Sequence, residues 1–154
     1  MTAPETESAA APPAAPPRPV RSQLPVLAAV ALGGGTGAAA RYAATLGWPA
    51  GTGGFPWTVF WVNVAGCAVI GVFMTVTDVW PVHRLLRPFF GTGVLGGFTT
   101  FSTFTVDFRQ LAGTGHLPVA LAYLAATPLA ALTAVWLAAS ATRRVLTVTG
   151  GRSS

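Results

Sequence analysis

The stretch Gly91–Phe104 reads GTGVLGGFTTFSTF and lies inside an apolar segment long enough to cross a lipid bilayer. Its centre is a run of glycine, threonine and serine, where an ordinary spanning helix carries Leu, Val and Ile. Backbone polar groups released inside a bilayer must be satisfied within protein or around a cavity. Gly96 and Gly97, followed by Thr99 and Thr100, therefore predict a broken helix, because glycine tolerates unusual backbone dihedral angles.

A broken helix exposes backbone carbonyls, and these are suitable ligands for a cation such as Na⁺. Phe101 and Phe104 are three residues apart and so share one helical face. The positive edges of their rings, together with nearby hydroxyls, can replace part of the hydration shell of a small anion. The alternative is that the threonines and the serine only bond back to the carbonyls of their own helix.

Three stretches resemble the Fluc (CrcB) family of fluoride channels: Gly91–Phe104, GGGTGAAARY at 33–42, and the VN-x-x-G of Val62–Gly66. The resemblance implies a fluoride-specific ion channel that lets fluoride leave the cell passively and so lowers its cytoplasmic concentration and toxicity. It also implies an antiparallel dimer of two oppositely inserted subunits. A structural sodium ion, required but not transported, would be held at the dimer centre by the backbone oxygens of Gly96 and Thr99.

Composition places the chain in a membrane. Of its 154 residues 52% are hydrophobic and 8% are charged, whereas soluble domains carry about 25% charged residues. No basic stripe interleaved with aromatics is present, which argues against nucleic-acid binding. The single Cys67 excludes a disulfide within the chain and a cysteine-based metal cluster, and we expect it to be a packing residue. No nucleophile–base–carboxylate set indicates an enzyme.

The pattern of apolar segments predicts an all-α membrane protein with four transmembrane helices and a break in the third. The helices are expected at about 24–46, 57–77, 89–108 and 118–140, after a disordered tail at 1–23 and before a basic tail at 141–154. Two GxxxG pairs, Gly33 with Gly37 and Gly93 with Gly97, predict close helix packing.

Two polar residues inside these segments each have two interpretations. Arg41 near the end of the first helix either extends its side chain to the interface or lies at a pore vestibule that attracts anions. Asn63 in the second helix either makes an interhelical hydrogen bond or presents an N–H donor to a permeating anion. The resemblance favours the vestibule for Arg41 and the pore for Asn63.

The predicted fluoride path also contains hydroxyls. The proposed donors are Ser102, Thr103, Tyr123 and Thr127, together with Asn63 and the ring edges of Phe101 and Phe104. Tyr123 and Thr127 are four residues apart and share a helical face, although their hydroxyls could equally bond the backbone. Ala131 stands one turn further, where members of the family often carry a second hydroxyl, so the predicted polar track ends at Thr127.

Charge is distributed unequally across the predicted membrane. Four helices put both termini on one side, which the positive-inside rule predicts to be the cytoplasm. That side carries Arg18, Arg21, Arg84, Arg87, Arg143, Arg144 and Arg152. The other carries Arg109, with Arg41 near the membrane edge. A chain that inserts in both orientations should be nearly balanced, so we expect a paralogous partner subunit of opposite bias, although a homodimer is possible.

Two other functions compete with the fluoride channel. A small four-helix drug or cation exporter needs a carboxylate within the membrane, whereas Glu5, Glu7, Asp78 and Asp107 are expected outside or at the edges of the helices. A non-conducting partner subunit would have lost its pore residues, whereas Asn63, Phe101 and Phe104 are all present.

Overall fold

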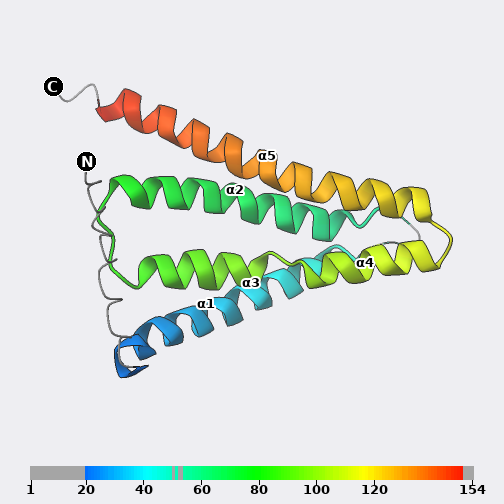
Figure 1. The fold of residues 1–154 in the computed structure, drawn as a ribbon, viewed down its shortest axis with the longest axis horizontal. Coiled ribbons are helices and arrows are strands. Elements are labelled where there is room, and N and C mark those ends of the chain that lie inside the picture. The colour runs from blue at the N-terminus through cyan, green and yellow to red at the C-terminus, as the bar shows by residue number, and fades with distance from the viewer. Residues whose placement is uncertain (1–19, 50, 52–53, 151–154) are drawn as a thin grey trace, which may run out of the picture.

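The computed structural model describes residues 20–49, 51 and 54–150, and the regular elements among them are helices. Figure 1 shows them as an elongated bundle in which Val20 and Gly150, the described ends of the first and last helices, lie at the same end. The elements are α1 (Val20–Gly47), α2 (Trp57–Val79), η1 (Arg87–Leu95), α3 (Gly96–Phe98), α4 (Ser102–Gly113) and α5 (Leu117–Gly150).

Three helices are long and apolar enough to cross a membrane. They comprise Gln23–Gly47, Trp57–Val79 and Leu117–Val148. The fourth crossing is the broken run η1–α3–α4, which lies alongside them in Figure 1. The chain is therefore an all-α membrane protein with a break in its third spanning segment, as the sequence predicts.

Glycines bring α1 and the first half of the broken helix into backbone contact. A Cβ at Gly37 would overlap the carbonyl oxygen of Val94, and one at Gly93 would lie 2.9 Å from the Cα of Gly33. A Cβ at Gly97 would overlap the carbonyl oxygen of Gly34. The two GxxxG pairs of the sequence thus face one another, and the predicted close packing is confirmed.

The second pair of helices, α2 and α5, run parallel to each other and opposite to α1 and the broken helix (Figure 1). Gly71 of α2 approaches the backbone of α5, because a Cβ there would lie 2.6 Å from the carbonyl oxygen of Val135. Near the other end, Val59, Phe104 and Tyr123 form a buried cluster that joins α2, α4 and α5. This packing fixes which residues of α2 and α5 meet the break.

The break lies slightly later than the glycines suggest. Gly96 and Gly97 are helical, and Gly96 has φ −66° and ψ −34°. The chain leaves the helix at Thr99, which is extended with φ −72° and ψ 154°, and re-enters it at Ser102. Gly97 therefore allows close packing against α1, and the chain leaves the helix at Thr99 and Thr100.

Two other boundaries differ from the sequence prediction. The last helix continues to Gly150 instead of giving way to a tail at residue 141, and α4 continues to Gly113 instead of ending at Phe108. Asp107 consequently lies inside α4 rather than in a loop. Of the predicted disordered tail, residues 20–23 are helical, and residues 1–19 lie outside the described part of the chain.

Candidate functional site

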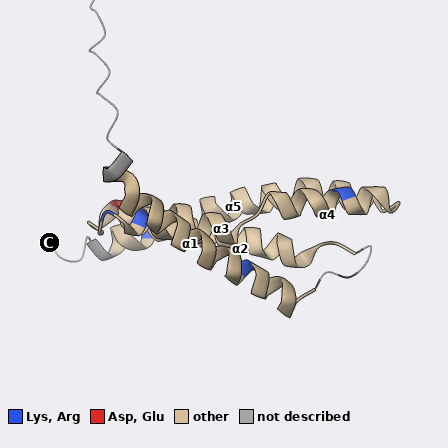
Figure 2. Cartoon of the chain, turned by 90° about the horizontal axis from the view of Figure 1, so that it is seen from below, with Lys and Arg blue, Asp and Glu red and all other residues tan. Residues whose placement is uncertain are grey.

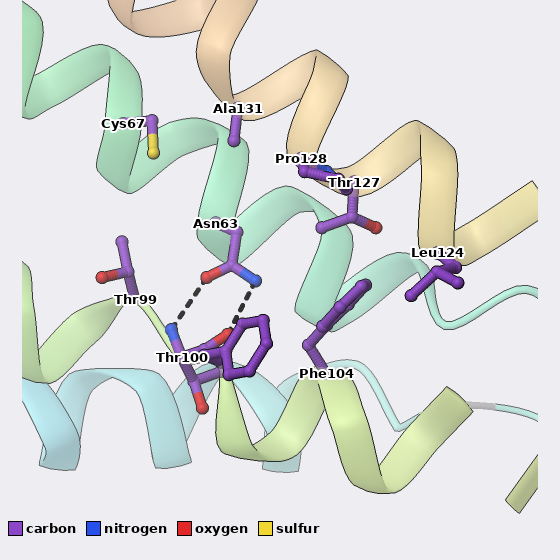
Figure 3. Close-up of a pocket in the computed structure, with 10 residues that line it drawn as sticks. Asn63, Cys67, Thr99, Thr100, Phe104, Leu124, Thr127, Pro128 and Ala131 are labelled. Carbon is purple, nitrogen blue, oxygen red and sulfur yellow. Dashed lines mark hydrogen bonds between the residues drawn. The ribbon is translucent and has the colours of Figure 1, made fainter. Parts of the chain in front are cut away.

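Asn63 holds the break in the third helix. Its Nδ2 donates to the carbonyl oxygen of Thr100 at 3.0 Å, and its Oδ1 accepts the N–H of the same residue at 2.8 Å (Figure 3). Asn63 is only 8% exposed, so one buried amide satisfies both backbone groups of a residue that has left the helix. An amide nitrogen carries two N–H donors, and Thr100 takes one of them. The two interpretations of Asn63 are therefore compatible.

Gly66 lies one turn further along the same face of α2 and makes room for the break. A Cβ at Gly66 would lie 2.5 Å from Cγ2 of Thr99 and 3.3 Å from the ring of Phe98. The spacing within Val62–Gly66 thus places the amide of Asn63, which bonds the break, next to Gly66, which leaves room for Thr99 and Phe98. The role of Gly66 was not predicted, although its position three residues after Asn63 puts both residues on one helical face.

The break removes the helical hydrogen-bond donors of several carbonyls, and those of Gly96 and Thr99 are among them. In an uninterrupted α-helix the N–H of Thr100 would pair with the carbonyl of Gly96, and that of Thr103 with the carbonyl of Thr99. Instead Thr100 donates to Asn63, and Thr103 donates to Oγ1 of Thr100 at 3.1 Å. The oxygens of Gly96 and Thr99 have thereby lost their helical donors, which suits them to act as ligands for a cation.

Arg41 points from α1 to the break rather than to the end of the bundle. Its Nε donates to the carbonyl oxygen of Gly97 at 3.2 Å, and its Nη1 donates to Oγ1 of Thr103 at 3.5 Å. Among the described residues, the one recorded ion pair is Arg87 with Asp78, so Arg41 is not neutralised by a carboxylate there. Arg41 therefore spans the two halves of the broken helix and leaves positive charge beside it.

The hydroxyls after the break form a cluster. Oγ1 of Thr100 donates to Oγ1 of Thr103 at 3.1 Å and lies 3.3 Å from Oγ of Ser102. Ser102 is exposed and Thr103 is half-buried. The structure thus brings the predicted donors Ser102 and Thr103 together, with Arg41 at their edge.

The two phenylalanines have opposite environments. Their ring centroids are 5.7 Å apart, in agreement with their shared helical face. Phe104 is 6% exposed and packs against Tyr123, whereas Phe101 is 78% exposed. An aromatic side chain so exposed within a membrane segment faces lipid or another chain.

Tyr123 lies away from these donors. It is fully buried, its ring packs against Phe55 and Phe104, and its hydroxyl donates to Oδ2 of Asp107 at 3.3 Å. It does not line the pocket at the break. The structure therefore gives Tyr123 a carboxylate partner that was not expected from the sequence, where Asp107 was placed outside or at the edge of the helices.

Thr127 differs from the other threonines of the bundle. Its hydroxyl is buried and has no hydrogen-bond partner among the described residues. Elsewhere, helical threonines bond the carbonyl three or four residues earlier, at 2.7–3.0 Å in Thr36, Thr75, Thr99, Thr105, Thr133 and Thr142. A buried hydroxyl without a partner is costly, by about 1–3 kcal/mol. The hydroxyl of Thr127 therefore keeps its hydrogen-bonding capacity unused within the described part of the chain.

These residues surround an open pocket of about 410 Å³ between α2, α4 and α5 (Figure 3). Asn63 and the threonines of the break form one side, and Thr127 with Ala131 forms the other. Cys67 is half-buried and lines the pocket as part of its wall. The full lining is Asn63, Cys67, Thr99, Thr100, Phe101, Phe104, Leu124, Thr127, Pro128 and Ala131.

The fold and site define a membrane helix bundle in which a broken helix presents polar backbone to an intramembrane pocket. The chain belongs to the CrcB family: the family model described as "CrcB-like protein, Camphor Resistance (CrcB)" matches residues 28–139. It is 76% identical over 127 residues to "Fluoride-specific ion channel FluC 1" of Streptomyces coelicolor, covering 82% of each chain. It is 66% identical over 134 residues to "Fluoride-specific ion channel FluC 2" of Streptomyces avermitilis, covering 82% of this chain and 85% of the other. It is also 53% identical over 119 residues to "Fluoride-specific ion channel FluC 2" of Nocardia farcinica, covering 77% and 85%.

Proposed function

We propose that this chain is a subunit of a fluoride-specific ion channel, not an enzyme, and that it lets fluoride leave the cytoplasm passively across the cell membrane. The relatives carry that name. The observation that supports the proposal most directly is the pocket, where a second N–H of Asn63 and the unpartnered hydroxyl of Thr127 are both available.

Dehydration is the main barrier for fluoride, because this small anion is strongly hydrated. The second N–H of Asn63 and the hydroxyl of Thr127 are fixed donors that can replace water. Ser102 and Thr103 add hydroxyls near the positive charge of Arg41. Selectivity against chloride follows from a narrow path and from donors placed for the smaller ion.

Aromatic edges complete the path. Phe104 is held by packing against Tyr123, and Phe101 lies beside it with its ring exposed. The positive edge of a phenyl ring stabilises an anion without binding it as tightly as a charged group would. Tyr123, whose hydroxyl donates to Asp107, contributes here by positioning Phe104, and reaches fluoride only if that hydrogen bond opens.

The oxygens of Gly96 and Thr99 fit a structural sodium ion, because both have lost their helical donors. When bound, the sodium ion supplies a fixed positive charge that offsets the cost of placing anions in a low-dielectric interior. Two carbonyls provide fewer oxygens than such a cation takes. A second subunit that contributes the same pair completes the set, and the ion then remains at the dimer centre without being transported.

A dimer also explains why two residues at the break, Gly96 and Phe101, are exposed in a single subunit. Gly96 is exposed, and a Cβ there would meet nothing within 4 Å. Phe101 is exposed beside the open pocket. We infer an antiparallel dimer in which the facing subunit covers both. Arg84 and Arg87 lie where α2 turns into η1, and Arg143 and Arg144 lie near the end of α5, at the same end of the bundle (Figure 1). Basic positions cluster at this end in Figure 2. This bias favours a paralogous partner of opposite charge bias, with the homodimer as the alternative.

The same bias supports an orientation with both termini in the cytoplasm. An interior-negative membrane potential then drives fluoride outward by about 2.3 kcal/mol per 100 mV. This corresponds to roughly a fifty-fold difference in concentration, so passive flow suffices for export.

The alternative function, a proton-coupled exporter, needs a carboxylate within the membrane. Asp107 is the residue to consider for that role, because it lies within α4 and not outside the helices. Its carboxylate accepts a hydrogen bond from Tyr123 and lies outside the pocket lining. The names of the relatives, which are ion channels, favour the channel.

The test is fluoride efflux from liposomes that contain Na⁺ and the purified chain, followed with a fluoride electrode and with chloride as the control anion. Selective efflux from the chain alone establishes a homodimeric channel. Efflux that appears only after the paralogous subunit is added establishes the heterodimer. No fluoride efflux in either preparation overturns the proposed function.

A further inference from the structure

A second pocket lies at the end of the bundle where α2 turns into η1. It has a volume of about 600 Å³. Its wall includes Trp80, His83 and Arg84 from the turn and Arg87 from the start of η1. The fluoride path proposed above makes no use of it.

One of the two arginines in this pocket is fixed and neutralised. Arg87 donates from Nε to Oγ1 of Thr77 at 3.1 Å and forms an ion pair with Asp78. These contacts tie the beginning of η1 to the last turn of α2. The pocket therefore has a rigid wall, and its carboxylate is already occupied.

The other polar groups of the turn remain available. Arg84 is exposed and has no carboxylate partner in the described part of the chain. His83 accepts the N–H of Leu85 at its Nδ1, at 3.3 Å, which leaves Nε2 to carry a proton and donate. Arg84 and His83 thus line the same pocket with unused donors, and α5, which carries Arg143 and Arg144 near its C-terminal end, ends at this end of the bundle (Figure 1).

An apolar groove lies along α2, and its lining ends at Val76, just before the first residue that lines the turn pocket. It has a volume of about 470 Å³ and is lined by Ala68, Val69, Val72, Phe73 and Val76. Val69 and Val72 are 53% and 43% exposed. On a helix, positions 69, 72, 73, 76 and 80 share one face, so Trp80, which lines the turn pocket, continues the face that forms the groove. Tryptophan is typical of the level between acyl chains and headgroups.

We propose that the groove and the turn pocket together bind one anionic phospholipid. Its phosphate contacts Arg84 and Nε2 of His83, its glycerol lies at the level of Trp80, and one acyl chain follows the groove along α2. An apolar groove that ends in uncompensated positive charge matches the two parts of such a lipid. This site is separate from the fluoride path and does not rest on the proposed channel function.

Lipid binding to the full-length protein in a neutral detergent tests the site. Native mass spectrometry counts the bound lipid while phosphatidylglycerol or phosphatidylcholine of identical chains is added. We expect phosphatidylglycerol to bind more tightly. Arg84→Ala should weaken its binding about fivefold, the factor equivalent to about 1 kcal/mol per arginine at an anionic surface. Arg84→Lys should retain most of the affinity.

Arg109→Ala is the matched control, because Arg109 is an exposed arginine on α4, away from this end. It should bind both lipids as the unmodified chain does.

Val72→Trp fills the groove and should weaken the binding of both lipids. Equal binding of the two lipids, or equal losses in Arg84→Ala and Arg109→Ala, overturns the site. If Val72→Trp instead lowers the dimer fraction and leaves lipid binding unchanged, the groove is an interface between subunits and the lipid assignment is wrong.

Discussion

Asn63 shows why residue identity at the break matters more than polarity. A carboxylate could accept the N–H of Thr100 but could not donate to its carbonyl, and a hydroxyl could not reach both groups. Only an amide offers a donor and an acceptor in one plane, at the 3.0 and 2.8 Å separations seen here. From the sequence, an interhelical hydrogen bond and a pore donor are alternative roles for Asn63, because the sequence does not show how many N–H and C=O groups of the amide are already hydrogen-bonded.

Other residues at this scale were predictable in part. The threonines, Ser102 and the two phenylalanines were identified from a local pattern, and the structure brings Ser102 and Thr103 together. Their burial was not predictable: Phe101 and Phe104 are three residues apart, yet one is exposed and the other buried. Burial depends on what α2 and α5 place opposite them, which local sequence does not encode.

The unpartnered hydroxyl of Thr127 gives a prediction that separates function from stability. Thr127→Val keeps the shape of the side chain and removes only that hydroxyl. Because the hydroxyl makes no hydrogen bond to the protein, we expect the thermal midpoint to stay unchanged or to rise. We expect the fluoride flux in liposomes to fall at least tenfold, the effect of losing about 1.4 kcal/mol of ion stabilisation.

Thr133→Val is the control for this substitution. Thr133 lies on the same helix, is exposed, and bonds the carbonyl of Leu129 at 2.7 Å. Its replacement should leave the flux unchanged. A flux that is equal in the two variants would remove Thr127 from the proposed fluoride path.

At the scale of elements, the position of the break was predicted from the sequence to within a few residues, but the residues expected to cause it were not the right ones. Glycine was expected to create the irregular backbone, whereas Gly97 packs against the backbone of α1 and the departure begins at Thr99. What diverts the chain is a hydrogen bond from a different helix. A hydrogen bond between two helices cannot be predicted from the sequence of the broken helix alone.

The last helix shows a second limit. The sequence was expected to end it near Ser140, where apolar residues give way to Arg143 and Arg144. The helix instead continues to Gly150. Hydropathy indicates where a segment leaves the membrane, but backbone propensity decides where a helix ends, and arginine, leucine and threonine do not stop one.

Helix packing gives the prediction at this scale. Gly37→Ala places a methyl group against the carbonyl oxygen of Val94, and the backbones of α1 and η1 must separate. We expect a loss of about 1–3 kcal/mol in the free energy of unfolding, as for other overpacked sites. The midpoint of thermal unfolding, followed by circular dichroism, measures it.

Gly35→Ala provides the matched control in the same helix. Its Cβ would meet nothing within 4 Å, so alanine should leave the midpoint unchanged or raise it, since alanine favours the helix by up to about 1 kcal/mol. If both variants lower the midpoint equally, the contact between α1 and η1 does not carry the stability assigned to it.

At the scale of the whole molecule, Gly96 tests the proposed dimer. Within the subunit a Cβ at this position meets nothing, so Gly96→Ala should fold and unfold as the unmodified chain does. A second subunit that brings its own carbonyls toward a shared sodium ion would meet the added methyl group. We therefore expect a lower dimer fraction by native mass spectrometry and a smaller gain in thermal midpoint when Na⁺ replaces a large organic cation.

Gly113→Ala is a suitable control, because it also has open space around its Cβ and lies at the far end of α4. It should leave the dimer fraction and the sodium effect unchanged. A Gly96→Ala variant that dimerises as well as Gly113→Ala would indicate that the subunits do not meet at this glycine.

The irregular segment between the two halves of the third helix is held by two neighbouring helices and by one of its own side chains. Asn63 holds it from α2, Arg41 holds its flanks from α1, and Oγ1 of Thr100 accepts the N–H of Thr103 in the helix that follows. A segment without helical structure would ordinarily be the part of a bundle that yields most easily. Here the hydrogen bonds from α1 and α2 fix the shape of the segment, so a ligand that binds beside it has little backbone to reorganise.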